Sequence, residues 1–255
     1  MIRLDNISLG YGSRTLIDSL SATVRRGELT ALVGRNGTGK STLLRALAGL
    51  DKPLGGDILL GGKSLSALSQ AELATTISFV TTDKVRISNL RCRDVVALGR
   101  APYTNWIGRM QESDRAIVEQ SLAAVAMSDY ADKTMDCMSD GECQRIMIAR
   151  ALAQQTPIIL LDEPTAFLDM PNRYELCSLL RQLAHNENKC ILFSTHELDI
   201  AVSLCDSIAL IAPPQLHLLP TEEMISSGYI ERLFAGSKAE SLFNIENYLK
   251  LGQKE

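Results

Sequence analysis

The chain has 255 residues, of which 45% are hydrophobic and 22% are charged, and its formal net charge is −4 at pH 7. This length is enough to bury the core of one large α/β domain, or of an α/β core with a subdomain. The mild negative charge argues against a protein that is held on nucleic acid or on a membrane surface by bulk charge.

Two strand patterns open the chain. Apolar and polar residues alternate over residues 2–9, which predicts an amphipathic edge strand, and residues 16–24 predict a second strand. We expect the two strands to form an antiparallel layer. The N-terminal ten residues lack the apolar run of a signal peptide, and no stretch approaches the roughly 20 apolar residues of a membrane span. We therefore expect a soluble, cytoplasmic chain.

A complete phosphate-loop motif, G-x-x-x-x-G-K-[ST], follows an apolar strand over 29–33 and precedes a helical pattern that stops at Gly49. Glycines let backbone N–H groups curl round an anion. Lys40 brings a positive charge to the β- and γ-phosphates, and Ser41 offers a hydroxyl to Mg²⁺. The sequence therefore predicts a binding site for a nucleoside triphosphate. Its residues are Gly34, Arg35, Asn36, Gly37, Thr38, Gly39, Lys40, Ser41 and Thr42.

The next segment predicts a short strand over 57–60, a short helix that begins at a capping box over 69–72, and a buried strand over 77–80. From about residue 83 to about residue 155 the pattern is helical and contains no convincing strand. In this helical part, Ser113 is a candidate N-cap, and a second capping box opens a long helix at Ser139.

The helical part divides the predicted α/β core. We expect the core to consist of residues 1–85 and 154–235, with residues 86–153 as an inserted helical subdomain and residues 236–255 as a C-terminal extension. After the insertion, continuous apolar runs predict buried strands, and a Pro-Pro turn predicts that the following segment pairs back. Thr221 is expected to cap a C-terminal helix. The buried strands are predicted over 158–161, 191–193 and 208–211.

An acidic pair, Asp162 and Glu163, follows the first of these strands. Because the carboxyl ends of parallel strands converge on the ligand crevice, we expect the pair to lie near the phosphate loop. There Asp162 would orient Mg²⁺, and Glu163 would accept a proton from the attacking water. The alternative is a solvated acidic pair without a role.

His196 follows the next apolar strand, so we expect it at the same edge of the sheet, holding the γ-phosphate or the attacking water. The alternative is an ordinary surface histidine. The other two histidines, His185 and His217, have no such context and are assigned no role.

The capping box at Ser139 also has two interpretations. Such boxes are common at helix starts and need no function. A helix N-terminus also attracts anions, but the phosphate loop already covers this chain's own nucleotide. If the helix start serves a phosphate, we expect the phosphate to belong to a nucleotide bound by a second copy of the chain.

The ordered set of motifs over residues 1–211 resembles the ATP-binding subunits of ABC transporters. The set consists of the phosphate loop, a Ser-x-Gly helix start, a strand that ends in Asp-Glu-Pro-Thr, and a strand that ends before His196. Tyr11 stands where the family stacks an aromatic ring on adenine, and Asp169 closes the segment that the family calls the D-loop. Asp140-Gly141-Glu142 stands where the family usually has Gly-Gly-Gln.

The resemblance implies a P-loop NTPase fold of the α/β class, with a mixed sheet that combines a parallel core and an antiparallel layer. It also implies a head-to-tail dimer that holds two ATP molecules with Mg²⁺. Each nucleotide would be contacted across the dimer by Ser139, Gly141, Glu142 and Asp169. Further implied partners are membrane permease subunits on the helical subdomain and, indirectly, a substrate-binding protein. The chain would then be peripheral, at the cytoplasmic face of the membrane.

One position departs from the resembled family. A glutamine that reaches Mg²⁺ and water usually follows the strand over 77–80, whereas this chain has Thr82 and then Asp83. Either residue is a candidate metal ligand in its place.

The segment 94–103 is similar to that of importers for iron–siderophores, haem and cobalamin. We therefore expect an ATPase subunit that energises uptake of a metal chelate or cobalamin. A non-transport ATPase acting on a soluble partner is the alternative. A nucleic-acid-associated ATPase is disfavoured, because the sequence has no basic stripe and no coiled-coil insertion.

Overall fold

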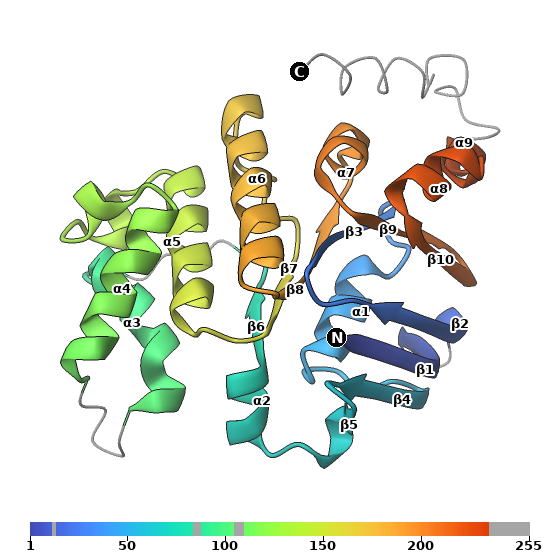
Figure 1. Ribbon diagram of the computed structural model, residues 1–255, viewed down its shortest axis with the longest axis horizontal. Coiled ribbons are helices and arrows are strands. Elements are labelled where there is room, and N and C mark those ends of the chain that lie inside the picture. The colour runs from blue at the N-terminus through green and yellow to red at the C-terminus, as the bar shows by residue number, and fades with distance from the viewer. Residues whose placement is uncertain (12–13, 84–87, 105–109, 235–255) are drawn as a thin grey trace.

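The computed structural model describes residues 1–11, 14–83, 88–104 and 110–234, and it contains two sheets in those residues. A six-stranded sheet has the order β10-β9-β3-β8-β7-β6, and a four-stranded sheet has the order β2-β1-β4-β5. Figure 1 shows the smaller sheet beside helix α1 and the larger sheet running through the middle of the molecule.

The larger sheet contains β3 (Glu28–Gly34), β6 (Ile77–Val80), β7 (Ile158–Leu161), β8 (Cys190–Thr195), β9 (Ser207–Ala212) and β10 (Gln215–Pro220). The smaller sheet contains β1 (Ile2–Tyr11), β2 (Arg14–Val24), β4 (Gly55–Leu60) and β5 (Lys63–Ser64). The α-helices are α1 (Lys40–Leu47), α2 (Gln70–Thr76), α3 (Cys92–Ala97), α4 (Glu112–Ala124), α5 (Asp140–Ala153), α6 (Met170–Asn186), α7 (Leu198–Leu204), α8 (Thr221–Ser226) and α9 (Tyr229–Phe234).

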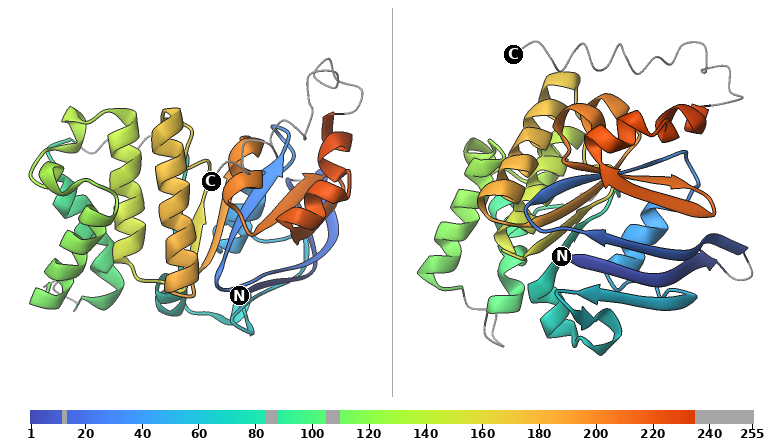
Figure 2. Two further views of the ribbon diagram at one scale, coloured as in Figure 1. Left: turned by 45° about the horizontal axis from the view of Figure 1, so that its top comes forward. Right: turned by 45° about the vertical axis from the view of Figure 1, so that its right-hand side comes forward.

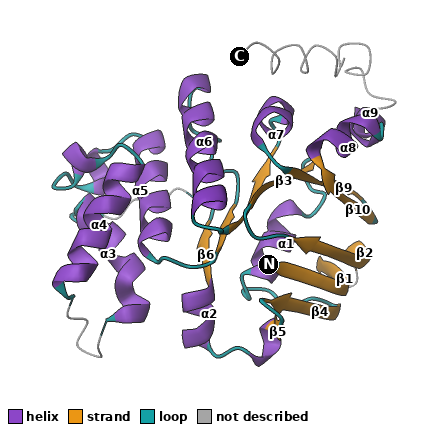
Figure 3. Ribbon diagram, viewed as in Figure 1, coloured by secondary structure: helices purple, strands orange, loops and turns teal. Residues whose placement is uncertain are grey.

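The expected mixed α/β architecture is confirmed. Strands β6, β7, β8, β3 and β9 pair in parallel, and β10 returns antiparallel to β9 after the Pro213-Pro214 turn. In the smaller sheet, β1 pairs antiparallel with β2 and with β4. Figure 3 shows this division between a helix-covered sheet and a separate antiparallel layer.

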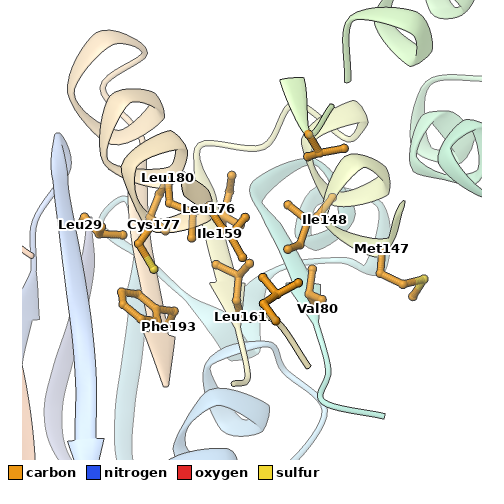
Figure 4. Packing of buried hydrophobic residues seen from close by; sticks show 14 of the residues in the cluster. Leu29, Val80, Met147, Ile148, Ile159, Leu161, Leu176, Cys177, Leu180 and Phe193 are labelled. Atoms are coloured by element: carbon orange, nitrogen blue, oxygen red, sulfur yellow. The ribbon is translucent and has the colours of Figure 1, made fainter. Parts of the chain in front are cut away.

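The strands of the larger sheet alternate their side chains between two hydrophobic cores. On β7, Ile159 and Leu161 belong to the core that α5, α6 and α7 cover, whereas Ile158 and Leu160 belong to the core shared with α1 and the smaller sheet. A continuous apolar run is needed because both faces of this strand are buried. Figure 4 shows Ile159 and Leu161 among side chains of α5 and α6.

Helices α3, α4 and α5 gather at one end of the molecule, and the smaller sheet lies toward the other end (Figures 1 and 2). Within this helical part, the described residues contain only one isolated β-bridge, between Arg91 and Thr134. This agrees with the helical pattern expected there. Among the described residues, no helix has both the length and the apolar content that a membrane span needs.

Three expectations about elements are wrong. The first strand is not at an edge, because β4 pairs with its free side; alternation predicts which face is buried but not which neighbours pair. Ser113 is not a cap, because α4 begins after Gln111, whose backbone N–H donates to Asp114 Oδ2 at 2.9 Å. Thr221 is the first residue of α8 and not its N-cap, and its hydroxyl donates to the carbonyl of Cys205.

Candidate functional site

Three neighbouring parallel strands carry the predicted site residues at their carboxyl ends. β3 pairs with β8, and β8 pairs with β7. The phosphate loop follows β3, Asp162 follows β7, and His196 follows β8. The structure therefore brings these segments to one edge of the sheet, where open α/β sheets bind ligands.

Gly34 and Gly39 show why the phosphate loop needs glycine. A Cβ added to Gly34 would lie 2.8 Å from Thr38 Oγ1 and 3.1 Å from the carbonyl oxygen of Ile211, so a larger residue would collide there. Gly39 has φ of 105°, a left-handed conformation that favours glycine, and it lies directly before α1. The loop thus leads into the N-terminus of α1, whose backbone N–H groups are suited to bind an anion.

Lys40 is buried, with 6% of its surface exposed, and its ammonium contacts the loop itself. Nζ donates to the carbonyl oxygens of Gly34 at 2.9 Å and Arg35 at 3.4 Å. Burial lowers the pKa of Lys40, and the charges of Glu163 and Asp162 oppose that shift. A bound phosphate would add the negative charge that this buried ammonium needs.

The carboxylate of Asp162 is oriented by a residue of the neighbouring strand. Ser194, which is fully buried on β8, donates from Oγ to Asp162 Oδ1 at 2.6 Å. The same hydroxyl accepts the backbone N–H of Glu163 at 2.9 Å. Glu163 has φ of 47°, which is unusual for a residue with a Cβ and is typical of functional sites.

His196 and Glu163 face each other at the mouth of the site. His196 Nδ1 lies 3.9 Å from Glu163 Oε2, and the imidazole is 58% exposed while the Glu163 side chain is 27% exposed. The separation exceeds a direct hydrogen bond, and the exposure leaves both groups accessible to a ligand or a water molecule. The arrangement is suited to a proton acceptor beside a polar contact for a phosphate.

The two candidate metal ligands that replace the family's glutamine differ in their exposure to solvent. Thr82 is half-buried, and its hydroxyl donates to the carbonyl oxygen of Asp162 at 3.0 Å. Asp83 is exposed. The predicted adenine contact, Tyr11, ends β1, and its side chain lies outside the described residues.

The residues predicted to act across a dimer border one surface cavity. Ser139 is the N-cap of α5, and Glu142 accepts hydrogen bonds from the backbone N–H and the hydroxyl of Ser139, both at 2.8 Å. These bonds hold the pKa of Glu142 below its usual value. A cavity of about 640 Å³ is bordered by this helix start and by the segment that ends at Asp169.

At this cavity, the start of α5 packs against the segment that ends at Asp169. A Cβ added to Gly141 would lie 3.2 Å from both Leu168 Cδ2 and the carbonyl oxygen of Phe167, so the helix start packs closely on that segment. Asp169 is the N-cap of α6 and accepts the backbone N–H of Asn172 at 3.2 Å. The four predicted residues therefore form one surface region.

Three residues of the site region were assigned no role from the sequence: Ser194, Arg173 and Glu197. Arg173 donates from Nε to the carbonyl oxygen of Leu168 at 2.6 Å and pairs through Nη1 with Glu197 Oε1 at 2.5 Å. It thus links the segment before Asp169 to the residue after His196. The available signal for Ser194 was a pair of hydroxyl residues, Ser194 and Thr195, at the end of an apolar buried strand.

The sequence matches a known family model and is similar to several transport proteins. Residues 17–166 match the family model described as ABC transporter. The probable siderophore transport system ATP-binding protein YusV of Bacillus subtilis is 37% identical over 235 residues, 92% of this chain and 86% of that protein. The cobalamin import ATP-binding protein BtuD of Halobacterium salinarum is 38% identical over 202 residues, 79% of this chain and 50% of that protein.

Solved structures share the fold. An inward-facing ABC transporter assigned to the metal-chelate type has a TM-score of 0.79 and 28% identity, covering 91% of this chain and 88% of its own. The dimeric ATP-binding cassette MJ0796, in a post-hydrolysis state with ADP and Pi, has a TM-score of 0.76 and 26% identity, covering 87% of this chain and 99% of its own.

Proposed function

Because this chain belongs to the ABC transporter family, we propose that it is the ATP-hydrolysing subunit of an importer for a metal chelate or cobalamin. The observation that carries the ATPase part is the convergence of the phosphate loop, the acidic pair and His196 on one sheet edge. The importer part is supported by relatives that are named for siderophore transport and cobalamin import.

In the proposed reaction, the phosphate loop and Lys40 bind the triphosphate. Glu163 accepts the proton of the attacking water, since its carboxylate is partly exposed and its backbone direction is fixed. His196 holds the γ-phosphate or the water from the other side. Positioning and electrostatic stabilisation supply most of the rate enhancement in phosphoryl transfer, and these residues supply both.

The oxygen atoms at this edge suit Mg²⁺, which prefers hard oxygen ligands and usually retains several waters. Ser41, at the start of α1, and Asp162, buried and oriented by Ser194, are the residues that would hold it. When bound, the ion would neutralise charge on the β- and γ-phosphates.

We also propose that two copies close over two nucleotides. Ser139, Gly141, Glu142 and Asp169 border one cavity, and its described lining does not include Lys40. A second copy in head-to-tail orientation would place this border against a nucleotide on the first copy's phosphate loop. A dimeric cassette of the same fold supports this arrangement.

Permease subunits would dock on the helical subdomain, proposed as residues 86–153, whose helices α3, α4 and α5 lie at one end of the molecule (Figure 1). Residues 1–85 and 154–235 would form the ATPase core, and 236–255 an extension. We propose that the chain works as a peripheral subunit at the cytoplasmic face of the membrane, where ATP is available. A substrate-binding protein would act through the permease.

The deciding experiment is affinity purification of the tagged chain from detergent-solubilised membranes of its own cells. A multi-span permease should be recovered with it, and the reconstituted complex should take up a ferric siderophore, haem or cobalamin only with ATP. Recovery of soluble proteins alone would contradict the importer and favour the non-transport ATPase.

A further inference from the structure

One peptide group in the site is held from both sides by hydroxyl groups, one from the segment after β6 and one from β8. It is the peptide that joins Asp162 to Glu163. From the β6 side, Thr82 Oγ1 donates to the carbonyl oxygen of Asp162 at 3.0 Å. From the β8 side, Ser194 Oγ accepts the N–H of Glu163 at 2.9 Å. Two side chains therefore fix the plane of this peptide.

The backbone at this peptide needs such support. Glu163 has φ of 47°, in the left-handed region that L-residues with a Cβ rarely occupy. Strained conformations of this kind persist only where the surrounding structure holds them. The conformation sets the direction in which the Glu163 carboxylate leaves the chain, and that carboxylate lies 3.9 Å from His196.

Ser194 also couples the two acidic residues. Its hydroxyl donates to Asp162 Oδ1 at 2.6 Å while it accepts from Glu163 N–H, so the carboxylate of one residue and the backbone of the next share one partner. Ser194 is fully buried and therefore has little freedom to move. Thr82 completes the set from the segment that follows β6, and it is half-buried.

We propose that Thr82 and Ser194 are positioning residues for ATP hydrolysis that fix the Asp162–Glu163 peptide and so aim the carboxylate of Glu163. The inference rests on the proposed function, in which Glu163 accepts the proton of the attacking water. It assigns Thr82 a role through the Asp162 carbonyl in place of the metal contact considered from the sequence.

The first test removes the Thr82 hydroxyl with little change of shape. Thr82→Val should lower kcat about tenfold, because small displacements of a catalytic group lower the rate strongly. The Kd for a fluorescent ATP analogue should stay within about twofold, and Thr82→Ser should restore most of kcat. Thr76→Val is the matched control, since the Thr76 hydroxyl also donates to a backbone carbonyl, that of Glu72 at 2.7 Å, but within α2. This control should keep wild-type kcat.

The second test asks through which group Thr82 acts. Single-turnover hydrolysis is measured with radiolabelled ATP in Glu163→Gln, alone and combined with Thr82→Val or Ser194→Ala. If both hydroxyls act by aiming Glu163, adding either change should lower the residual rate less than about twofold, because effects through one group are not additive. Melting temperatures of all variants are recorded, so that loss of folding is recognised.

The third test measures turnover against Mg²⁺ concentration. The half-saturating Mg²⁺ concentration should be the same in Thr82→Val and in the wild type. A higher requirement, with kcat restored by excess Mg²⁺, would make Thr82 a metal ligand and overturn the proposal. Full kcat in folded Thr82→Val, or a tenfold further loss in the Glu163→Gln background, would also overturn it. Normal turnover of Glu163→Gln itself would instead contradict the proposed function.

Discussion

The ammonium of Lys40 lies 2.9 Å from the carbonyl oxygen of Gly34, the residue with which the phosphate loop begins. The loop therefore holds its own lysine through a backbone carbonyl. A triphosphate would add negative charge beside this ammonium, whose charged form burial disfavours. Binding of a triphosphate and the protonation of Lys40 are consequently linked.

Lys40→Ala should weaken ATP binding by about 10- to 100-fold, the range expected for loss of hydrogen bonds between charged groups. Isothermal titration calorimetry with ATP measures the change. Arg45→Ala on the same helix is a suitable control, because Arg45 pairs with Asp51 at 2.8 Å, away from the loop. Equal affinities in the wild type and Lys40→Ala would contradict the role of Lys40.

The lowered pKa of Lys40 has a predictable effect on pH dependence. Its folded pKa lies below the ordinary 10.5, so between the two values the unfolded chain binds more protons and the stability of the empty protein rises with pH. Bound phosphate favours the charged form. ATP affinity should therefore fall as pH rises through the lowered folded pKa of Lys40, and this fall should be absent in Lys40→Ala.

Glu163→Gln should slow turnover by at least about 100-fold while ATP binding survives, because the change removes the proton acceptor and keeps the shape. A coupled-enzyme assay gives the rate, and equilibrium binding gives the Kd. Glu119→Gln, on the exposed side of α4, is the control and should turn over normally. Near-normal turnover of Glu163→Gln would show that another group is the base.

Ser139→Arg should block ATP-dependent dimerisation while the monomer still binds ATP, because a bulky cation would fill the surface that receives the partner's nucleotide. Light scattering with excess ATP measures the dimer. Ser69→Arg is a matched control, since Ser69 caps α2 with the same capping box through Glu72. Both variants lose an N-cap worth about 1 kcal/mol, and only Ser139→Arg should lose the dimer. Equal dimerisation of the two would contradict the proposed interface.

Glu142 should contribute to stability in an acid-sensitive way. Its folded pKa is lowered, first by the backbone N–H of Ser139 and then by the Ser139 hydroxyl. A carboxylate with a lowered folded pKa stabilises the folded protein above its unfolded pKa of about 4.5. This contribution is lost as the pH falls through the folded pKa. Urea unfolding between pH 3 and 7 measures the free energy of unfolding. This free energy should decrease less steeply with falling pH in Glu142→Gln than in the wild type, because glutamine retains a capping box without titrating. Identical profiles would contradict this.

Arg100 and Asp114 form a buried ion pair at 2.9 Å, with side chains 6% and 7% exposed. Arg100→Met should destabilise the protein by about 3–5 kcal/mol, because it leaves the Asp114 carboxylate buried without its partner. The double variant Arg100→Met/Asp114→Leu should recover part of that loss. Chemical denaturation measures both, and a double variant less stable than the single one would contradict the explanation.

Much of the site region could be predicted from sequence, because each motif lies at the end of a strand whose apolar run is unmistakable. The loop, the acidic pair and His196 therefore came to the expected edge. The capping box at Ser139 was likewise predicted from local spacing alone and is confirmed. Local patterns of this kind need no knowledge of distant partners.

The wrong or missing assignments all depend on distant partners. The first strand becomes internal because β4 reaches it from 50 residues away, and the start of α4 is set by Asp114, which Arg100 holds. The contact of Thr82 with Asp162 joins residues that are 80 positions apart. Pairings of this range are determined by tertiary packing, which residue types and spacing do not encode on their own.

The alternation of β7 between two cores restricts where the gene can tolerate a change of length. One codon inserted within this strand would move the side chains on one side of the insertion to the opposite face of the sheet, or shift the acidic pair by one position relative to the strand. In a library of single-codon insertions, variants with an insertion in this strand should therefore show no ATPase activity.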